Sequence, residues 1–154
     1  VEDVRAALAR HALPPDALTL EITESALLAD TDATLARLHA LRGLGVSLAV
    51  DDFGTGYSSL AYLHRFPVNV LKIDKAFVDG LGRPDADASL ARAVVAIGAA
   101  LGMRTVAEGI EEAAQAALLR ALGCQLGQGF LFARPMPGDE LTARLTEERG
   151  AVAV

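Results

Sequence analysis

The sequence predicts an α/β fold in which parallel strands and crossover helices form a (β/α) barrel-type arrangement. Short β-rich runs alternate with runs of helical periodicity along the 154 residues, an order that implies parallel strands joined by crossover helices. Both a doubly wound sheet and a (β/α) barrel satisfy this order. Polar residues at or near the carboxyl ends of the strand-like runs decide between them: Glu21, Asp51, Lys72, Glu108 and Gln128. An open sheet would bury them under helices at a large cost in free energy, whereas a barrel gathers them at its mouth.

The expected strands are runs of apolar and β-branched residues between turn signals. They comprise residues 18–23, 46–51, 68–74, 104–109 and 127–133. Helices are expected where apolar residues recur at helical spacing, as at Leu90, Val94, Ile97 and Leu101. The first expected helix covers residues 1–11, and the second begins at Thr31 or Asp32 and ends near Gly43 and Gly45. A third helix is expected from near Ser58 to before Pro67. Further helices are expected at 90–101 and 112–122, and a last one begins near Gly138.

Composition places the chain among globular proteins with a sizeable core. Hydrophobic residues make up 52% of the sequence, which suits one domain or part of a larger one. The formal net charge of −6 argues against a general binder of nucleic acid such as DNA, which would usually show a basic face. The single cysteine, Cys124, fits a reducing compartment, and the apolar run 93–101 is too short to span a bilayer. We expect a cytoplasmic domain with no membrane segment.

Two adjacent carboxylates, Asp51 and Asp52, stand at the end of a strand-like run. Their repulsion requires a counter-charge, a metal ion or access to water. With Glu21 and Glu108 they form an all-oxygen set, which suits Mg²⁺ or Mn²⁺ better than zinc. The set holds more carboxylates than one divalent ion needs, so we expect two ions about 4 Å apart, as in phosphodiester cleavage. Lys72 is then expected to orient the attacking water or to neutralise a phosphate oxygen.

Several motifs carry a family resemblance. They read LEITES at 20–25, DDFGTGYSSL at 51–60, LKID at 71–74, AEGIE at 107–111 and QGFLFARPMP at 128–137. In this order and spacing they resemble the motifs of the EAL-domain cyclic di-GMP phosphodiesterases. The resemblance implies a partial modified TIM (β/α) barrel of about five parallel strands. It also implies hydrolysis of cyclic di-GMP to linear pGpG by a metal-activated water, with Mg²⁺ or Mn²⁺ as cofactor.

The resemblance further implies roles for individual residues. The metal ligands would be Glu21, Asp51, Asp52 and Glu108, and the catalytic residues Lys72, Glu108, Glu111 and Glu24. The substrate-binding residues would be Gln128, Arg134 and Pro135, although a solvated arginine and a loop-closing proline explain the last two equally well. A loop held by Glu24 would lie near a dimer interface and couple dimerisation to the site; it contains Phe53, Gly54, Thr55, Gly56 and Tyr57.

One departure from the family pattern concerns the extent of the domain. The chain has no Glu-Ala-Leu motif, and its first strand-like run already corresponds to EITES. Because a full (β/α)₈ barrel has about 250 residues, we expect residues 1–154 to be an incomplete EAL domain without roughly its first 90–100 residues. A partial barrel leaves an unpaired strand edge at 18–23. We therefore expect impaired activity from this chain alone, and either pairing with another copy or a longer protein with a sensory or GGDEF domain.

The sequence leaves two other functions open. A non-catalytic receptor would bind cyclic di-GMP and signal through dimerisation, whereas an interaction module would bind no ligand. Equilibrium dialysis against the dinucleotide, with and without Mg²⁺, separates the module from the other two functions. DDFGTG is neither a P-loop nor a dinucleotide fingerprint, because it lacks a following Gly-Lys-Ser/Thr and a third glycine. An aspartyl-phosphate phosphatase would not explain Glu21 or Glu108.

Overall fold

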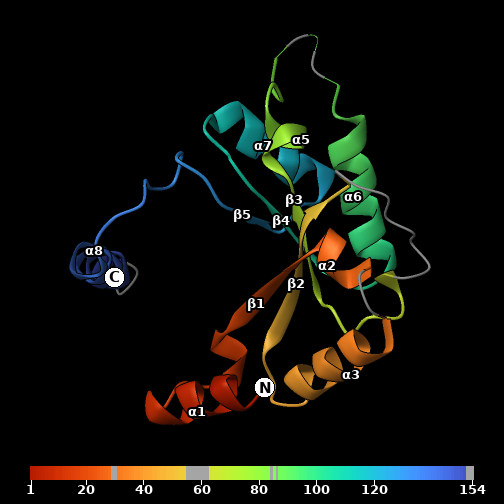
Figure 1. The fold of residues 1–154 in the computed structure, drawn as a ribbon. Coiled ribbons are helices and arrows are strands. Elements are labelled where there is room, and N and C mark those ends of the chain that lie inside the picture. Colours follow the sequence, from red (N-terminus) through yellow and green to blue (C-terminus); the bar gives the residue numbers. More distant parts are fainter. Residues whose placement is uncertain (29–30, 55–62, 84, 86, 152–154) are drawn as a thin grey trace.

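The computed structural model describes residues 1–28, 31–54, 63–83, 85 and 87–151. Within this part of the chain, parallel strands form one sheet in sequential order (Figure 1). The strands are β1 (Thr19–Thr23), β2 (Ser47–Phe53), β3 (Val70–Ile73), β4 (Arg104–Ala107) and β5 (Leu126–Gly127). Sequential order with parallel pairing is the arrangement of a (β/α) barrel segment, in which each crossover moves to the next neighbour. The predicted fold class is confirmed.

Helices connect the strands and flank the sheet. They are α1 (Glu2–Arg10), the 3₁₀ turn η1 (Pro15–Ala17), α2 (Glu24–Leu28), α3 (Thr31–Arg42), α5 (Lys75–Val78), α6 (Ser89–Ala100), α7 (Ala113–Leu122) and α8 (Gly138–Ala151). Figure 1 shows α3 and α6 on the same side of the sheet, while α8 stands apart from it. The start of the helix predicted near Ser58 lies outside the described residues. Across the described ranges, no helix combines the length and apolar character needed to cross a membrane.

The predicted strand at 127–133 is wrong, because β5 ends at Gly127. The chain turns at Gly129, whose carbonyl accepts hydrogen bonds from the amides of Phe132 and Ala133 at 3.1 and 3.3 Å. Phe130 and Phe132 are exposed in this turn, although their apolar side chains had suggested a buried strand. An apolar run of this length does not by itself distinguish a strand from a turn. In contrast, β2 continues to Phe53, beyond the predicted end at 51.

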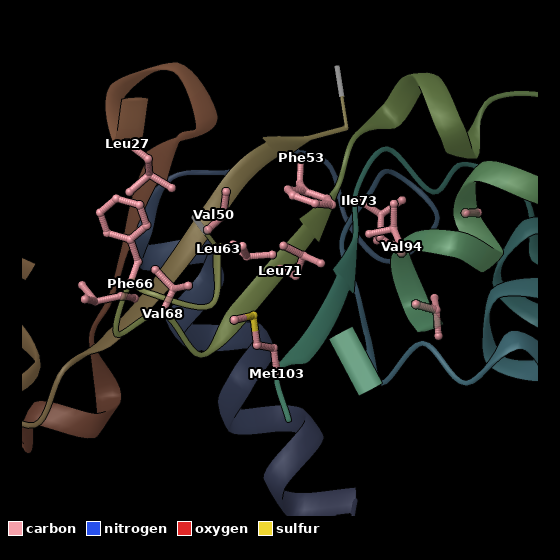
Figure 2. Close-up of a cluster of buried hydrophobic side chains, with 14 of the residues drawn as sticks. Leu27, Val50, Phe53, Leu63, Phe66, Val68, Leu71, Ile73, Val94 and Met103 are labelled. Atoms are coloured by element: carbon pink, nitrogen blue, oxygen red, sulfur yellow. The ribbon is translucent and has the colours of Figure 1, made fainter. Parts of the chain in front are cut away.

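The alternation of side chains gives the sheet two different faces. One face packs under the helices and forms the core, with Leu48, Val50, Leu71 and Ile73 fully buried. Figure 2 shows side chains from neighbouring strands, among them Val50, Leu71 and Ile73, gathered in this cluster. The other face borders a hollow of about 280 Å³ lined by Asp16, Thr19, Glu21, Ala49, Val70, Lys72, Arg104, Val106, Leu126 and Gln128. The polar strand-end residues therefore share the face that the helices leave open.

Leu71→Ala is expected to lower the free energy of unfolding by about 3 kcal/mol, because it leaves a cavity in the middle of the helix-covered face. Leu71 is fully buried on the central strand β3. Urea unfolding followed by circular dichroism measures the change. Leu90→Ala is the matched control, since Leu90 is 58% exposed on α6 and should cost about 0.5 kcal/mol or less. Equal losses in the two variants would contradict this assignment of the core.

Candidate active site

Lys72 lies at the centre of a cluster of three carboxylates. Its Nζ is 2.7 Å from Glu21 Oε2, 2.9 Å from Asp51 Oδ1 and 2.8 Å from Glu108 Oε1. The side chain of Lys72 is only 6% exposed, whereas those of its partners are 19–49% exposed. Glu21 comes from β1, Asp51 from β2 and Lys72 from β3, and Glu108 follows β4. Strand order and side-chain alternation thus bring together four residues that are far apart in the sequence.

The charge of Lys72 is fixed by this environment. Burial lowers the pKa of Lys72, but hydrogen bonds to Glu108, Glu21 and Asp51 outweigh burial and raise it above its ordinary value. The side chain is therefore an ammonium group at neutral pH. It can donate hydrogen bonds to a water or a phosphate oxygen, but it cannot act as a general base.

A β-bulge brings both adjacent aspartates to the same place. Neighbouring residues of a regular strand point to opposite faces, but the register of β2 with β3 shifts between Val50 and Phe53. Asp52 lies in this bulge with a left-handed backbone at φ 54°, a conformation that aspartate adopts more readily than most residues. As a result, ligand oxygens of Asp51, Asp52 and Glu108 all lie within 4.8 Å of one another.

This carboxylate group fits a hard divalent cation. The donors are all oxygens, which Mg²⁺ and Mn²⁺ prefer, and no histidine or cysteine belongs to the group. Desolvation, together with the charges of Asp51 and Asp74, raises the pKa of Asp52. The like charges therefore repel one another despite the nearby ammonium of Lys72, and a bound cation would relieve that repulsion.

Glu24 connects the start of α2 to the end of β2. Its side chain is buried, and its Oε2 accepts a hydrogen bond from the Gly54 amide at 3.1 Å. Oε1 of Glu24 is also buried and has no hydrogen-bond partner among the described residues. Phe53, before the glycine, packs in the core rather than facing outward. Thr55, Gly56 and Tyr57 lie outside the described residues.

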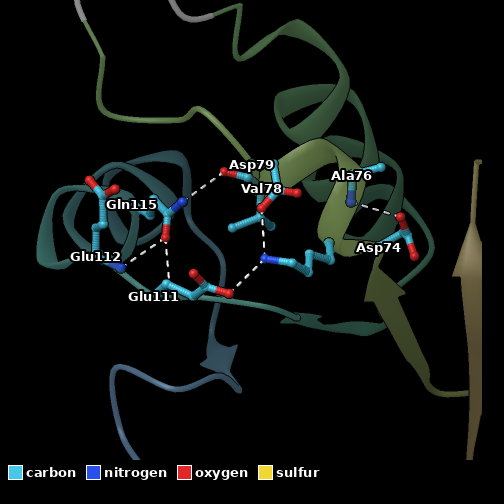
Figure 3. Close-up of polar contacts among 8 residues, drawn as sticks. Asp74, Ala76, Val78, Asp79, Glu111, Glu112 and Gln115 are labelled. Atoms are coloured by element: carbon cyan, nitrogen blue, oxygen red, sulfur yellow. Dashed lines mark hydrogen bonds and ion pairs between the residues drawn. The ribbon is translucent and has the colours of Figure 1, made fainter.

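Glu111 is held in a separate network, outside the Lys72 cluster. Its Oε1 is 2.9 Å from the Nζ of Lys75, which also lies 2.8 Å from Asp79 Oδ1. Hydrogen bonds that the Lys75 ammonium donates to Asp79 and Glu111 raise its pKa to about 12. Figure 3 shows Glu111 and Asp79 in this network with Gln115 nearby.

The three predicted substrate-binding residues do not share one environment. Gln128 lines the hollow together with Lys72 and Glu21. Arg134 and Pro135 are exposed and are absent from the described lining of that hollow. The guanidinium of Arg134 lies over the ring of Phe130, 4.6 Å from its centroid, in a cation–π contact.

Sequence reasoning missed Lys75 and Gln115, which hold the segment after β4. Gln115 is buried, and its Oε1 accepts hydrogen bonds from the amides of Glu111 and Glu112 at 2.8 and 3.0 Å. The spacing of Glu112 and Gln115 is that of a capping box at the start of α7, a pattern readable in the sequence. Lys75 carries no comparable signal, because its partner Glu111 is 36 residues away.

Comparison with known proteins agrees with the motifs. The family model described as "EAL domain" matches residues 1–135. MucR of Pseudomonas aeruginosa, named a bifunctional diguanylate cyclase/cyclic di-GMP phosphodiesterase, is 50% identical over 143 residues, which are 93% of this chain and 21% of MucR. The chain spans about a fifth of the length of curated relatives such as MucR and NbdA.

Solved structures are similar in both sequence and fold. The MucR phosphodiesterase in complex with c-di-GMP has a TM-score of 0.85 and 50% identity, covering 91% of this chain and 62% of that one. A manganese/cy-diGMP complex of Klebsiella pneumoniae BlrP1 has a TM-score of 0.76 and 37% identity, covering 84% of this chain and 33% of that one. On the strength of the matched family model and these identities, the chain belongs to the EAL domain family.

Proposed function

We propose that this chain forms part of a phosphodiesterase that hydrolyses cyclic di-GMP to linear pGpG with the help of divalent cations. The observation that carries the proposal is the Lys72 cluster, in which one buried ammonium contacts carboxylates from three other segments. The names of the relatives add support, since MucR and NbdA of Pseudomonas aeruginosa are both called cyclic di-GMP phosphodiesterases.

Glu21, Asp51, Asp52 and Glu108 would hold the cations, which we take to be two Mg²⁺ or Mn²⁺ ions. A divalent ion supplies a Lewis acid that polarises a phosphoryl oxygen and makes water a nucleophile at neutral pH. Complexes of BlrP1 with calcium and with manganese support the use of divalent metal in this family.

The chain's own side chains would orient the reactants. Lys72, an ammonium at neutral pH, would donate a hydrogen bond to the attacking water or to a phosphate oxygen. Glu24 would fix the start of the loop after Asp52 through the Gly54 amide. Glu111 would position the segment that carries Glu108.

Substrate contacts would come from the rim of the same face. Gln128 would meet the phosphate or sugar from within the hollow, whose lining it shares with Lys72. Arg134 and Pro135 would meet a guanine base at the edge, with the Arg134 guanidinium oriented by its stacking on Phe130.

The assembly and the surrounding protein belong to the proposal as well. The loop from Phe53 to Tyr57 would contribute to a homodimer and couple dimerisation to cation binding. A sensory or GGDEF domain would accompany this chain in a longer protein, as the double name of MucR suggests. Because the chain covers 62% of the solved MucR phosphodiesterase, we expect the isolated 154 residues to be less active than a complete domain.

Glu108→Gln is expected to lower hydrolysis of cyclic di-GMP by about a thousandfold, because the amide keeps the shape but loses the negative charge needed to hold a cation. Chromatography of the linear product, with Mn²⁺ or Mg²⁺ present, measures turnover. Excess EDTA should abolish the wild-type reaction. Glu140→Gln is the matched control, since Glu140 is an exposed residue of α8.

Two results would contradict the proposal. One is turnover that persists in EDTA, and the other is equal turnover in the wild type and Glu108→Gln. If the isolated chain shows no turnover, the same pair of variants is compared in a longer protein that contains this chain. Absence of turnover there would reject the phosphodiesterase function.

A further inference from the structure

The segment from Glu108 to Glu112 carries an expected metal ligand and is anchored at several points. The Glu108 amide donates to the Ile73 carbonyl at 3.0 Å, which fixes the segment to the end of β3. The Ile110 amide donates to the Gln128 carbonyl at 3.1 Å, which fixes it to the chain after β5. Its position relative to β3 therefore decides where the Glu108 carboxylate lies.

Lys75 contacts this segment along the whole length of its side chain. Its ammonium binds Glu111 at 2.9 Å, and its stem lies directly against Gly109. A Cβ at position 109 would come within 2.4 Å of Lys75 Cγ, and the glycine has a φ of +67°, so this position suits only glycine. Gly109 is thus the residue that lets the Lys75 stem pack on the backbone.

Two lysine–glutamate pairs join the same two segments. Lys72 contacts Glu108, and Lys75, three residues later, contacts Glu111, which is three residues after Glu108. β3 runs into α5 with only Asp74 between them, so both lysines belong to one short strand–helix unit. The Lys75–Glu111 pair therefore requires the same alignment of the two segments as the Lys72–Glu108 pair.

Gln115 completes the connection from the other side. Its Oε1 accepts the amides of Glu111 and Glu112, and its Nε2 donates to the Val78 carbonyl of α5 at 3.3 Å. Figure 3 shows Gln115 between the Glu111–Glu112 backbone and α5. The segment is consequently tied to α5 at two places, one exposed and one buried.

We propose that Lys75 is a positioning residue, which holds the segment 108–112 so that the Glu108 carboxylate is placed for cation binding beside Lys72. This inference rests on the proposed function, because it assumes that Glu108 is a metal ligand. Lys75 acts through Glu111 and Gly109 and does not itself need to touch substrate or cation.

For the variant Lys75→Met, the proposal and simple electrostatics predict opposite changes in cation affinity. Lys75→Met keeps an unbranched stem of similar length and removes the ammonium. Removing a nearby positive charge should by itself tighten the binding of a cation. Loss of positioning should instead weaken binding, by about tenfold if Lys75 behaves like other residues that orient metal ligands.

The first experiment is hydrogen–deuterium exchange of the metal-free protein. In Lys75→Met the amides of Glu111 and Glu112 should exchange about tenfold faster than in the wild type, because local opening of the segment becomes easier. The second experiment is a titration with Mn²⁺ alone, in which electron paramagnetic resonance measures the concentration of the free ion. Here the apparent Kd of Lys75→Met should rise about tenfold.

Two matched controls distinguish loss of positioning from two simpler effects. These effects are the loss of a positive charge and the loss of an ion pair within a helical turn. Arg5→Met also removes an ion-paired cation, on α1 at the opposite end of the sheet (Figure 1). Asp79→Asn removes the other partner of Lys75 within its own helical turn and leaves the Glu111 contact. Both controls should leave the exchange rates and the Mn²⁺ affinity within about twofold of the wild type.

Unchanged exchange of residues 108–112 in Lys75→Met would overturn the proposal, whatever the chain hydrolyses. Unchanged or tighter Mn²⁺ binding by a folded Lys75→Met would overturn it as well. If the wild type binds no Mn²⁺, the metal part of the proposed function fails, and exchange alone decides whether Lys75 holds the segment.

Discussion

Lys72→Met is expected to lower the free energy of unfolding by about 3 kcal/mol in metal-free buffer. The substitution removes the only cation that contacts Glu21, Asp51 and Glu108 among the described ion pairs, and it leaves three carboxylates close together without compensation. Breaking a buried ion pair from one side typically costs about 3–5 kcal/mol, and the partly exposed carboxylates place this case at the lower end. Under the proposed function, turnover of cyclic di-GMP should also fall by at least about a hundredfold, since the proposed donor to the reacting group is lost.

The same variant should respond more strongly to divalent cations than the wild type. A cation bound by Asp51, Asp52 and Glu108 would replace part of the charge that Lys72 supplies, so added Mn²⁺ should recover part of the lost stability. Thermal unfolding in EDTA and in excess Mn²⁺ measures the difference. Arg92→Met is the control, because Arg92 is an exposed residue of α6. Unchanged stability of Lys72→Met in EDTA would show that the ion pairs contribute nothing.

Gly129→Ala is expected to lower the free energy of unfolding by about 3 kcal/mol, through a clash with main-chain atoms. A Cβ on Gly129 would lie 2.1 Å from the Ile110 carbonyl oxygen and 2.3 Å from its nitrogen. No rotamer change relieves a contact with backbone, so the hydrogen bonds of Ile110 with Gln128 and Leu131 must break or stretch. Because Ile110 lies two residues after Glu108, Mn²⁺ binding should weaken together with stability.

Urea unfolding and Mn²⁺ titration of the same preparations test this expectation. Gly138→Ala is the matched control, since a Cβ at Gly138 meets nothing within 4 Å among the described residues. It should change stability by about 0.5 kcal/mol or less. A Gly129→Ala protein as stable as Gly138→Ala would mean that the segment 128–131 does not hold Ile110 tightly.

Local chemistry determined much of the architecture. The order of strands and helices follows from hydrophobic periodicity, which is a property of neighbouring residues. The shared face of Glu21 and Lys72 follows from the alternation of side chains along a strand, given that Leu20, Ile22, Leu71 and Ile73 belong with the core. Both could be derived from the sequence because covalent geometry fixes them within a few residues.

Prediction from the sequence fails where the structure of one segment depends on its pairing with a distant segment. The run 127–133 has the composition of a strand, yet Gly127 is the only one of its residues that pairs with β4. After that, hydrogen bonds with Ile110 and the turn at Gly129 divert the chain. A strand ends where its neighbouring strand stops pairing with it, and the residues of one run do not reveal where that neighbour ends.

The sequence by itself determined the α/β order, the family and the residues that gather at the carboxyl ends of the strands. Only the tertiary structure decided how Asp51 and Asp52 come to the same place, through a bulge in β2, and which charge faces Asp51, namely Lys72 of β3. It also revealed that the segment after β4 is held against α5, through the contacts of Lys75 with Glu111 and of Gln115 with Val78. The physical reason is that hydrogen bonds and ion pairs depend on distances in space, and side chains 20 or more residues apart meet only after the strands have paired.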